Sequence, residues 1–465
     1  MSISKSIILN TDSYKVSMWK QYPPGTTGVY SYIESRGGRY DRTVFFGLQA
    51  FIKEYLLTPI TQADIDIAAE ILTAHGEPFN RAGWQYILDK HAGYLPVVIR
   101  AVPEGTVVPV KNVLATIENT DSECFWLTTY LETALLRAVW YPTTVATQSW
   151  NIKQIIKHFL EKTGDPALID FKLHDFGARG VSSMESAGIG GAAHLVNFMG
   201  TDTITGILYA REYYGAGIAG FSIPAAEHST ITSWGRDNEV KAYENMVNQF
   251  GRPGSILAVV SDSYDIFNAA SVLWGEELRQ KVIDSGATVV IRPDSGDPVK
   301  VNMRLVEILG EKFGYTTNTK GFKVLNNVRL IQGDGVNELT IRSILGAFMA
   351  MGWSADNIAF GMGGALLQAL DRDTQRFAMK ASSAQINGTW VDVQKDPITD
   401  FGKKSKKGRV ELWESSGMYQ SAVNQPNGWT DQGVTWKPVL QEVFRDGKLV
   451  NEIDFETVRQ NSNKV

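Results

Sequence analysis

The chain has 465 residues, enough for two or three domains or for one large core with a second lobe. Its 45 basic and 50 acidic residues give a formal charge of −5 without a strong basic block, which argues against nucleic acid as a partner. The apolar runs are too short for a membrane span, no signal peptide is visible, and the single cysteine, Cys124, excludes an internal disulfide framework and any multi-cysteine metal site. We expect a cytoplasmic protein.

The first 165 residues combine helical and strand patterns. Residues 1–40 look irregular and rich in tyrosine, around the turn Pro23-Pro24-Gly25. A β-meander is expected over 97–117. Apolar periodicity predicts helices over 44–57, 63–74, 81–88, 125–140 and 144–162.

From residue 166 to residue 373 strands alternate with helices. Each expected strand ends in a polar or glycine-rich turn, and the strands are 171–174, 219–223, 256–260, 288–291, 329–332 and 358–360. Amphipathic helices are expected over 237–250, 299–313 and 337–351. This order predicts a parallel sheet with right-handed crossovers, and six or more such units favour an irregular, TIM-like α/β barrel.

The pattern changes after residue 373. Short antiparallel strands are expected over 377–381, 389–393 and 409–413, with a basic loop at 403–409 and a helix near 454–459. We expect this C-terminal segment, 374–465, to join residues 1–165 in a second α+β lobe, leaving 166–373 as the barrel domain.

The stretch Ala287–Asp297, ATVVIRPDSGD, shows where chemistry is expected. A buried strand ends in a cation and carboxylates, and ligands bind at the C-terminal ends of strands in such folds. The alternative is a polar loop in which an aspartate caps the next helix. Parallel neighbours would gather similar residues, namely Asp175, His228, Asp262, Asp265, Arg292, Asp294, Asp334 and the glycines of GDG and GMGG.

These residue types suit a phosphorylated sugar with Mg²⁺. Glycine-rich turns offer backbone N–H groups to phosphate, arginine binds phosphate in bidentate fashion, and carboxylates hold Mg²⁺ or ribose hydroxyls. GMGG by itself could equally be a tight turn. Of the six histidines, only His228 follows a strand end and precedes a helix, where an anionic group would be favoured.

Nine strings of the sequence resemble the nicotinamide phosphoribosyltransferase family, in register along almost the whole chain. They are TDSYK (11–15), YPPGT (22–26), HDFGARGVSS (174–183), NFMGTDT (197–203), PAAEHSTIT (224–232), VSDSYDI (260–266), IRPDSGDP (291–298), IQGDGV (331–336) and KKSKKGR (403–409). The resemblance implies a type II phosphoribosyltransferase, a homodimer with shared active sites. It also implies transfer of a phosphoribosyl group from 5-phosphoribosyl-1-diphosphate to nicotinamide in NAD salvage.

The resemblance assigns roles to individual residues. Phe176 and the partner subunit's Tyr14 would sandwich the pyridine ring, and Asp202 would accept a hydrogen bond from the carboxamide and repel nicotinate. Arg292 would lie near the amide and the phosphates, and Asp294 would hold the ribose hydroxyls. The 5′-phosphate and ribose set is Arg179, Asp294, Gly333, Asp334, Gly363 and Gly364.

The same resemblance implies ATP as a co-substrate and Mg²⁺ as the cofactor. His228 would be autophosphorylated by ATP, and the catalytic set would be His228, Asp294 and Asp265. Mg²⁺ would be held through diphosphate, waters and Asp265 or Asp294. The diphosphate and ATP set is Arg36, His228, Arg292, Arg372, Lys380 and Lys395.

Two other functions stay open at this point. A nicotinate- or quinolinate-using phosphoribosyltransferase should place a cation or a neutral group where Asp202 stands. A non-catalytic signalling or scaffolding protein could share the fold, although the intact site residues argue against a purely binding role.

Overall fold

The computed structural model describes residues 5–399, 404–423, 425, 429–431 and 433–464, so Lys403 of the basic loop lies outside it. The chain divides into two compact units. Unit 1 comprises Met1–Thr147, Ala210–Ala216 and Leu370–Val465, and unit 2 comprises Gln148–Tyr209 and Gly217–Ala369. The boundaries expected at 165 and 373 remain a prediction. No helix in the described ranges is both long and apolar enough to cross a membrane.

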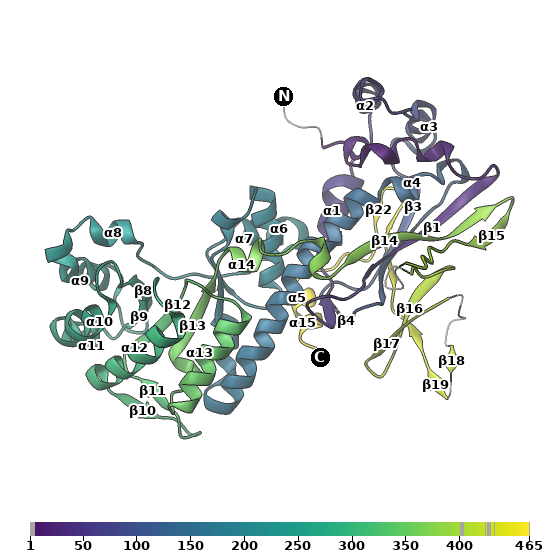
Figure 1. The fold of residues 1–465 in the computed structure, drawn as a ribbon. Coiled ribbons are helices and arrows are strands. Elements are labelled where there is room, and N and C mark those ends of the chain that lie inside the picture. Colours follow the sequence, from purple (N-terminus) through teal and green to yellow (C-terminus); the bar gives the residue numbers. More distant parts are fainter. Residues whose placement is uncertain (1–4, 400–403, 424, 426–428, 432, 465) are drawn as a thin grey trace. The chain divides into compact units, whose positions relative to one another are not determined.

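Unit 2 is built on a six-stranded parallel sheet in the order β7-β6-β13-β12-β9-β8, of which Figure 1 labels β13, β12, β9 and β8. The strands are β6 (Leu173–Asp175), β7 (Gly200–Thr201), β8 (Ile256–Val260), β9 (Thr288–Arg292), β12 (Val328–Gln332) and β13 (Ile358–Met362). The segment 221–226 contacts both edge strands of this sheet. Phe221 forms a parallel β-bridge with Gly200 of β7, and Ala225 forms one with Ala258 of β8. The expected parallel α/β sheet is confirmed.

Helices follow these strands, and the periodicity predicts three of them, over 237–250, 299–313 and 337–351. The principal ones are α6 (Met184–Leu195), α7 (Ile204–Tyr214), α8 (His228–Thr232), α9 (Glu239–Phe250), α10 (Ile266–Asn268), α11 (Arg279–Ser285), α12 (Pro298–Phe313), α13 (Glu338–Ala350) and α14 (Gly364–Leu367), with a π-helix η9 (Ala269–Glu277). The α12 helix packs against α13 and β12. Asp297 caps α12, accepting hydrogen bonds from the N–H groups of Val299 and Lys300, as the capping alternative predicts. A small hairpin, β10 (Tyr315–Thr317) and β11 (Lys323–Leu325), extends from the unit.

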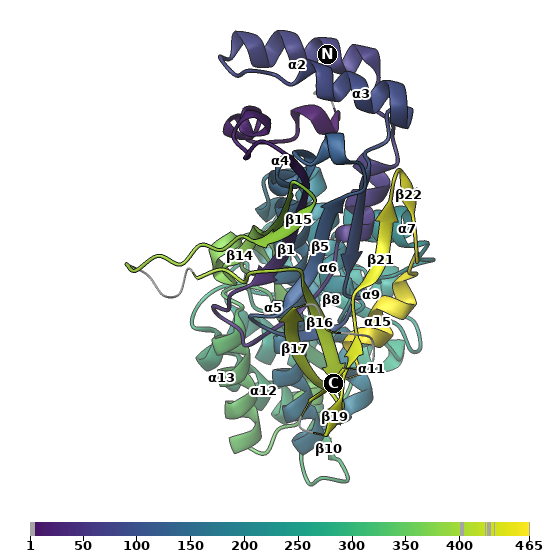
Figure 2. The same ribbon diagram turned by 90° about the vertical axis from the view of Figure 1, so that its right-hand side faces the viewer.

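Unit 1 contains a seven-stranded antiparallel sheet in the order β15-β14-β1-β5-β3-β21-β22, and Figure 2 shows β14, β1, β5 and β21 along it. Its strands are β1 (Thr26–Ser35), β3 (Val97–Ala101), β5 (Val113–Asn119), β14 (Phe377–Ile386), β15 (Thr389–Asp392), β21 (Gln441–Arg445) and β22 (Lys448–Leu449). Strands from both ends of the chain therefore meet in one sheet. The remaining strands are β2 (Arg42–Val44), β4 (Val107–Pro109), β16 (Val410–Ser415), β17 (Met418–Val423), β18 (Thr430–Asp431), β19 (Val434–Thr435) and β20 (Lys437–Pro438).

Two sequence predictions for unit 1 are wrong. The irregular region expected over 1–40 contains the ten-residue strand β1, which lies between β14 and β5 and is buried almost throughout. Burial on both faces removes the polar–apolar alternation that marks a half-buried strand, and two register shifts against β14 break the pattern further.

The two helices expected over 125–140 and 144–162 are also not separate. One helix, α5 (Glu132–Thr163), continues through Pro142. Gly47 leaves room for the proline ring, since a Cβ at residue 47 would lie 2.4 Å from Pro142 Cγ. A proline removes one backbone donor, and here the surrounding packing outweighs that loss.

The other helices of unit 1 are short. They are α1 (Leu48–Phe51), the π-helix η4 (Ile52–Leu56), α2 (Gln62–Ala74), α3 (Arg81–His91), α4 (Leu127–Tyr130) and α15 (Phe455–Ser462), with 3₁₀ turns that include η2 (Ser13–Lys15), η5 (Ser122–Cys124) and η11 (Arg372–Thr374). They cover a core that includes Trp84, Trp126 and Tyr130 packed edge to face.

Candidate active site

Arg292 and Asp294 meet at the C-terminal end of β9. Arg292 donates a hydrogen bond from Nη2 to Asp294 Oδ1 at 2.9 Å. The neighbouring β8 contributes Asp262, whose Oδ2 accepts from the Asp294 N–H at 2.9 Å and from the Ser295 hydroxyl at 2.5 Å. The Asp262 side chain is only 4% exposed, and its Oδ1 is buried without a hydrogen-bond partner among the residues that the structure describes. The sequence placed Asp262 among the strand-end residues but assigned it no role.

His228 lies against these carboxylates. Its Nε2 is 3.6 Å from Asp262 Oδ1 and 3.5 Å from Asp294 Oδ2, and its Nδ1 is 3.0 Å from the Ser263 hydroxyl. The imidazole remains 45% exposed, so it stays accessible to a substrate. Since α8 covers only His228–Thr232, its macrodipole is weak, and the paired carboxylates dominate the electrostatics around His228.

Phe176 directly follows β6, and its ring lies across the ends of β13 and β12. A Cβ at Gly361 would stand 1.9 Å from Phe176 Cε2, and one at Gly333 would stand 3.5 Å from the same atom. The Arg292 guanidinium is 5.9 Å from the ring centroid. Two glycines thus leave the space that the aromatic ring occupies, and nothing in the sequence links Gly361, the first residue of GMGG, to that ring.

Asp202 is exposed at the end of β7, and the Ser222 hydroxyl donates to its Oδ1 at 2.6 Å. Its N–H donates to the main-chain oxygen of Asp175 at 2.9 Å, which ties it to the residue that precedes Phe176. The Asp175 carboxylate is buried and accepts from the Gly177 N–H at 2.7 Å, while its Oδ2 has no hydrogen-bond partner in the described part of the chain. Burial, with a smaller contribution from Asp202, raises the pKa of Asp175 to about 6.

The glycine turns predicted to hold phosphate lie close together. Gly363 is the N-cap of α14 and Gly364 its first residue, with no atom within 4 Å of a Cβ built at Gly364 except the chain's own neighbours. The turn η7 (Ala178–Gly180), which carries the exposed Arg179, approaches this point, since a Cβ at Gly180 would lie 3.2 Å from Gly364 Cα. Asp334 is exposed after β12, and its main-chain oxygen accepts from Gln332 Nε2 at 2.7 Å.

The side chain of Asp265, a predicted site residue, caps a helix in the structure. Its Oδ1 caps α10, accepting from the N–H groups of Phe267 and Asn268 at 3.0 and 3.1 Å. An acidic residue directly before a short helix is a common capping signal. Asp262, three residues earlier, contacts His228 instead.

Five predicted site residues belong to unit 1. Tyr14 lies on η2 with its side chain 58% exposed, and Lys395 is exposed after β15. Arg36 donates from Nε to Glu34 Oε1 at 3.2 Å, and its Nη2 is buried with no hydrogen-bond partner within the described ranges. Arg372 pairs with Asp373 at 2.9 Å, and Lys380 lies 3.4 Å from Glu132 Oε1.

Comparisons with known proteins place this geometry in a family. A model of the nicotinate phosphoribosyltransferase (NAPRTase) family matches residues 171–448, and one of the nicotinamide phosphoribosyltransferase N-terminal domain matches residues 6–99. The chain is 58% identical to a nicotinamide phosphoribosyltransferase of Xanthomonas campestris pv. campestris over 458 residues, 98% of this chain and 97% of that one. It is 34% identical to a nicotinamide phosphoribosyltransferase of Acinetobacter baylyi over 492 aligned residues, covering 97% of this chain and 95% of that one.

A solved structure supports the fold independently. The nicotinate-nucleotide pyrophosphorylase of Pyrococcus furiosus superposes with a TM-score of 0.65 at 19% identity, covering 99% of this chain and 96% of that chain. The chain belongs to the nicotinate phosphoribosyltransferase (NAPRTase) family. Within it, the near-full-length relatives and the N-terminal domain match group the chain with the nicotinamide phosphoribosyltransferases.

Proposed function

We propose that this enzyme transfers the 5-phosphoribosyl group of 5-phosphoribosyl-1-diphosphate to nicotinamide, as in NAD salvage. The observation that carries the proposal is the connection of Asp202 to Phe176 through Asp175, at the same strand ends as Arg292. An aromatic face next to an exposed carboxylate suits a flat ring that bears a carboxamide, whose N–H groups donate to the carboxylate.

The chemical step requires positioning and charge stabilisation. The pyridine nitrogen forms a bond to ribose C1 while the bond from C1 to the diphosphate oxygen breaks, which gives nicotinamide mononucleotide and diphosphate. Positive charge develops on the ribose, so carboxylates at Asp294 and Asp262 stabilise it, and Arg292 offers its guanidinium to the leaving anion. Phe176 holds the nucleophilic ring.

The residues at β8 and β9 suit a magnesium ion. Asp262 Oδ1 is buried and no described residue gives it a hydrogen bond, and Asp294 Oδ2 lies on the same side, facing His228. Mg²⁺ is commonly held by one or two carboxylates together with substrate phosphates. Asp262 and Asp294 would therefore hold the ion in preference to Asp265, which caps α10. When bound, Mg²⁺ neutralises the charge of the diphosphate.

We extend the proposal to ATP coupling through His228. In the tautomer whose Nδ1–H donates to the Ser263 hydroxyl, Nε2 carries the lone pair that a nucleophile needs. Nε2 would attack the γ-phosphorus of ATP, the bond to the β–γ bridging oxygen would break, and ADP would leave. Hydrolysis of the phosphohistidine would then return His228 and phosphate. The exposure of the imidazole supports this access.

A homodimer is part of the same proposal. Tyr14 exposes most of its ring on η2, which suits a residue that stacks on the substrate of a partner subunit. Arg36, Arg372, Lys380 and Lys395 would provide cations for diphosphate and ATP, partly across the interface. The partners proposed are nicotinamide, 5-phosphoribosyl-1-diphosphate and ATP, and a cytoplasmic location remains an expectation.

Product analysis tests the reaction. Purified protein is incubated with labelled nicotinamide, 5-phosphoribosyl-1-diphosphate and Mg²⁺, with and without ATP. We expect nicotinamide mononucleotide and diphosphate in equal amounts, with more product when ATP is present. Failure of well-folded protein to form the mononucleotide would overturn the proposal and favour a binding role.

A further inference from the structure

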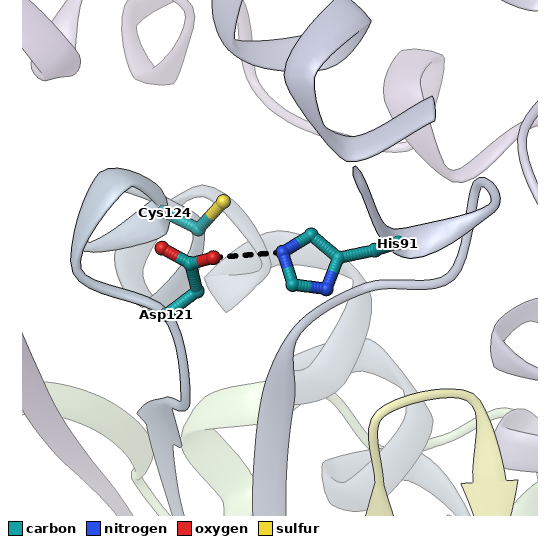
Figure 3. Close-up of side chains that lie close together, drawn as sticks. All are labelled: His91, Asp121 and Cys124. Atoms are coloured by element: carbon teal, nitrogen blue, oxygen red, sulfur yellow. Dashed lines mark hydrogen bonds and ion pairs between the residues drawn. The ribbon is translucent and has the colours of Figure 1, made fainter. Parts of the chain in front are cut away.

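Unit 1 contains a cluster of three metal-ligating side chains outside the active site. His91 is the last residue of α3, while Asp121 caps η5 and Cys124 ends it. One ligand atom from each, the His91 imidazole nitrogen, an Asp121 carboxylate oxygen and Cys124 Sγ, lies within 4.8 Å of the other two. In Figure 3 the imidazole and the carboxylate face each other, and the Cys124 sulfur lies beside them.

The thiol is the unusual member of this cluster. Cys124 is fully buried and forms no disulfide, and within the described ranges no hydrogen bond reaches its sulfur. His91 and Asp121 are 25% and 21% exposed, so the cluster has a buried sulfur at its base and a side open to solvent. A buried soft ligand with a hydrated imidazole and carboxylate in front of it is a donor set that an ion can reach.

We propose that His91, Asp121 and Cys124 form a binding site for Zn²⁺ or a similar thiophilic divalent cation. Zinc takes nitrogen, oxygen and sulfur ligands at about 2.0–2.3 Å in tetrahedral geometry, which separates the donor atoms by about 3.3–3.6 Å. His91 Nε2 and Asp121 Oδ2 are now 2.8 Å apart, so small side-chain rotations would bring all three donors onto one ion. A water molecule would complete the tetrahedron.

The surrounding contacts orient the donors. The Tyr86 hydroxyl donates to Asp121 Oδ2 at 3.1 Å, and the Glu123 N–H donates to Asp121 Oδ1 at 2.9 Å. The Tyr86 ring also packs at a tilt against His91, with centroids 5.9 Å apart. Such partners of the ligands fix ligand orientation in metal sites. On binding, the ion displaces the thiol proton, which leaves to solvent, so the site carries thiolate, carboxylate and neutral imidazole.

Metal uptake by the full chain tests the site. Protein stripped with a chelator is mixed with one equivalent of Zn²⁺, passed through a desalting column and analysed for metal, and its affinity is measured against a competing chelating dye. We expect one bound zinc per chain. His91→Gln should weaken binding at least about tenfold, and Tyr86→Phe about tenfold. His75→Gln, which changes an exposed histidine directly after α2, should bind as the wild type does.

Cobalt reports on the sulfur directly. Co²⁺ added to the wild type should give a thiolate-to-cobalt charge-transfer band, which Cys124→Ser should lack. Because Cys124 is buried and its replacement can disturb folding, the part-exposed His91→Gln decides the case if Cys124→Ser does not fold. The proposal is overturned if the wild type shows no such band with Co²⁺, or if His91→Gln retains zinc with wild-type affinity. Neither result depends on phosphoribosyl transfer.

Discussion

The ring of Phe176 lies directly over Gly361, where a Cβ would stand only 1.9 Å from Phe176 Cε2. Gly361→Ala must therefore displace the ring, which the proposal assigns to the pyridine ring of the substrate. We expect the KM for nicotinamide to rise about tenfold, because the stacking interaction is lost. Gly346→Ala, inside α13 with no neighbouring atom within 4 Å, is the matched control and should leave the KM unchanged. An unchanged KM in Gly361→Ala would remove Phe176 from this role.

Asp202 is expected to discriminate the amide from the acid. Asp202→Ser removes the charge that repels nicotinate, so the ratio of kcat/KM for nicotinamide to that for nicotinate should fall by about tenfold or more. Steady-state kinetics with both substrates measures this ratio. Asp284→Ser, an exposed residue near the end of α11, serves as the control. Equal discrimination in Asp202→Ser and the wild type would exclude Asp202 as the selectivity determinant.

His228 is expected to link ATP to product formation. His228→Ala should abolish the stimulation by ATP and retain part of the basal synthesis, since the phosphohistidine cannot form. Rates with and without ATP, together with a test for acid-labile phosphate on the protein, check this expectation. His158→Ala changes an exposed histidine of α5 and should keep the stimulation. Persistent ATP stimulation in His228→Ala would refute the coupling.

Asp175 should make the free energy of unfolding depend on pH. Burial raises its pKa from 3.8 to about 6, so between these values the native state binds more protons than the unfolded state. The carboxylate consequently costs stability as pH rises through this range, and above pH 6 the cost reaches about 1–3 kcal/mol. Asp175→Asn has no such charge and should stabilise the protein at pH 8 more than at pH 4.5.

Thermal unfolding midpoints at these two pH values measure the difference between Asp175→Asn and the wild type. Asp165→Asn, which changes an exposed cap of η6 (Pro166–Phe171), is the control for the same substitution at a surface position. If Asp175→Asn shifts the unfolding midpoint equally at pH 4.5 and pH 8, the buried Asp175 carboxylate does not lower the free energy of unfolding.

β7 (Gly200–Thr201) was not predicted, and the strand expected over 219–223 is an isolated bridge at Phe221. The other five strands of the unit 2 sheet were predictable because they are short runs that each end in a polar or glycine turn. That pattern also placed Arg292 and Asp294 together, and they pair at 2.9 Å. The contacts of His228 with Asp262 and Ser263 depend on how β8 and α8 approach each other, which spacing along the chain does not encode. Asp262 and Asp265 both follow β8, but Asp265 caps a helix and Asp262 contacts His228. Their positions in the sequence do not distinguish these two roles.

Other features depend on long-range packing. β1 is buried on both faces and has no alternation to reveal it, and α5 continues through Pro142 because Gly47 leaves room for the ring. The place of Phe176 over Gly361 joins two segments far apart in the chain, and a glycine at a strand end gives no hint of the ring that needs it.

Competition between the two pyridine substrates tests whether the enzyme acts on nicotinamide rather than on nicotinate. The enzyme is given equal concentrations of nicotinamide and nicotinate with limiting 5-phosphoribosyl-1-diphosphate and Mg²⁺, and the mononucleotides are separated and quantified. We expect nicotinamide mononucleotide to be the dominant product. Nicotinate mononucleotide as the dominant product would contradict it.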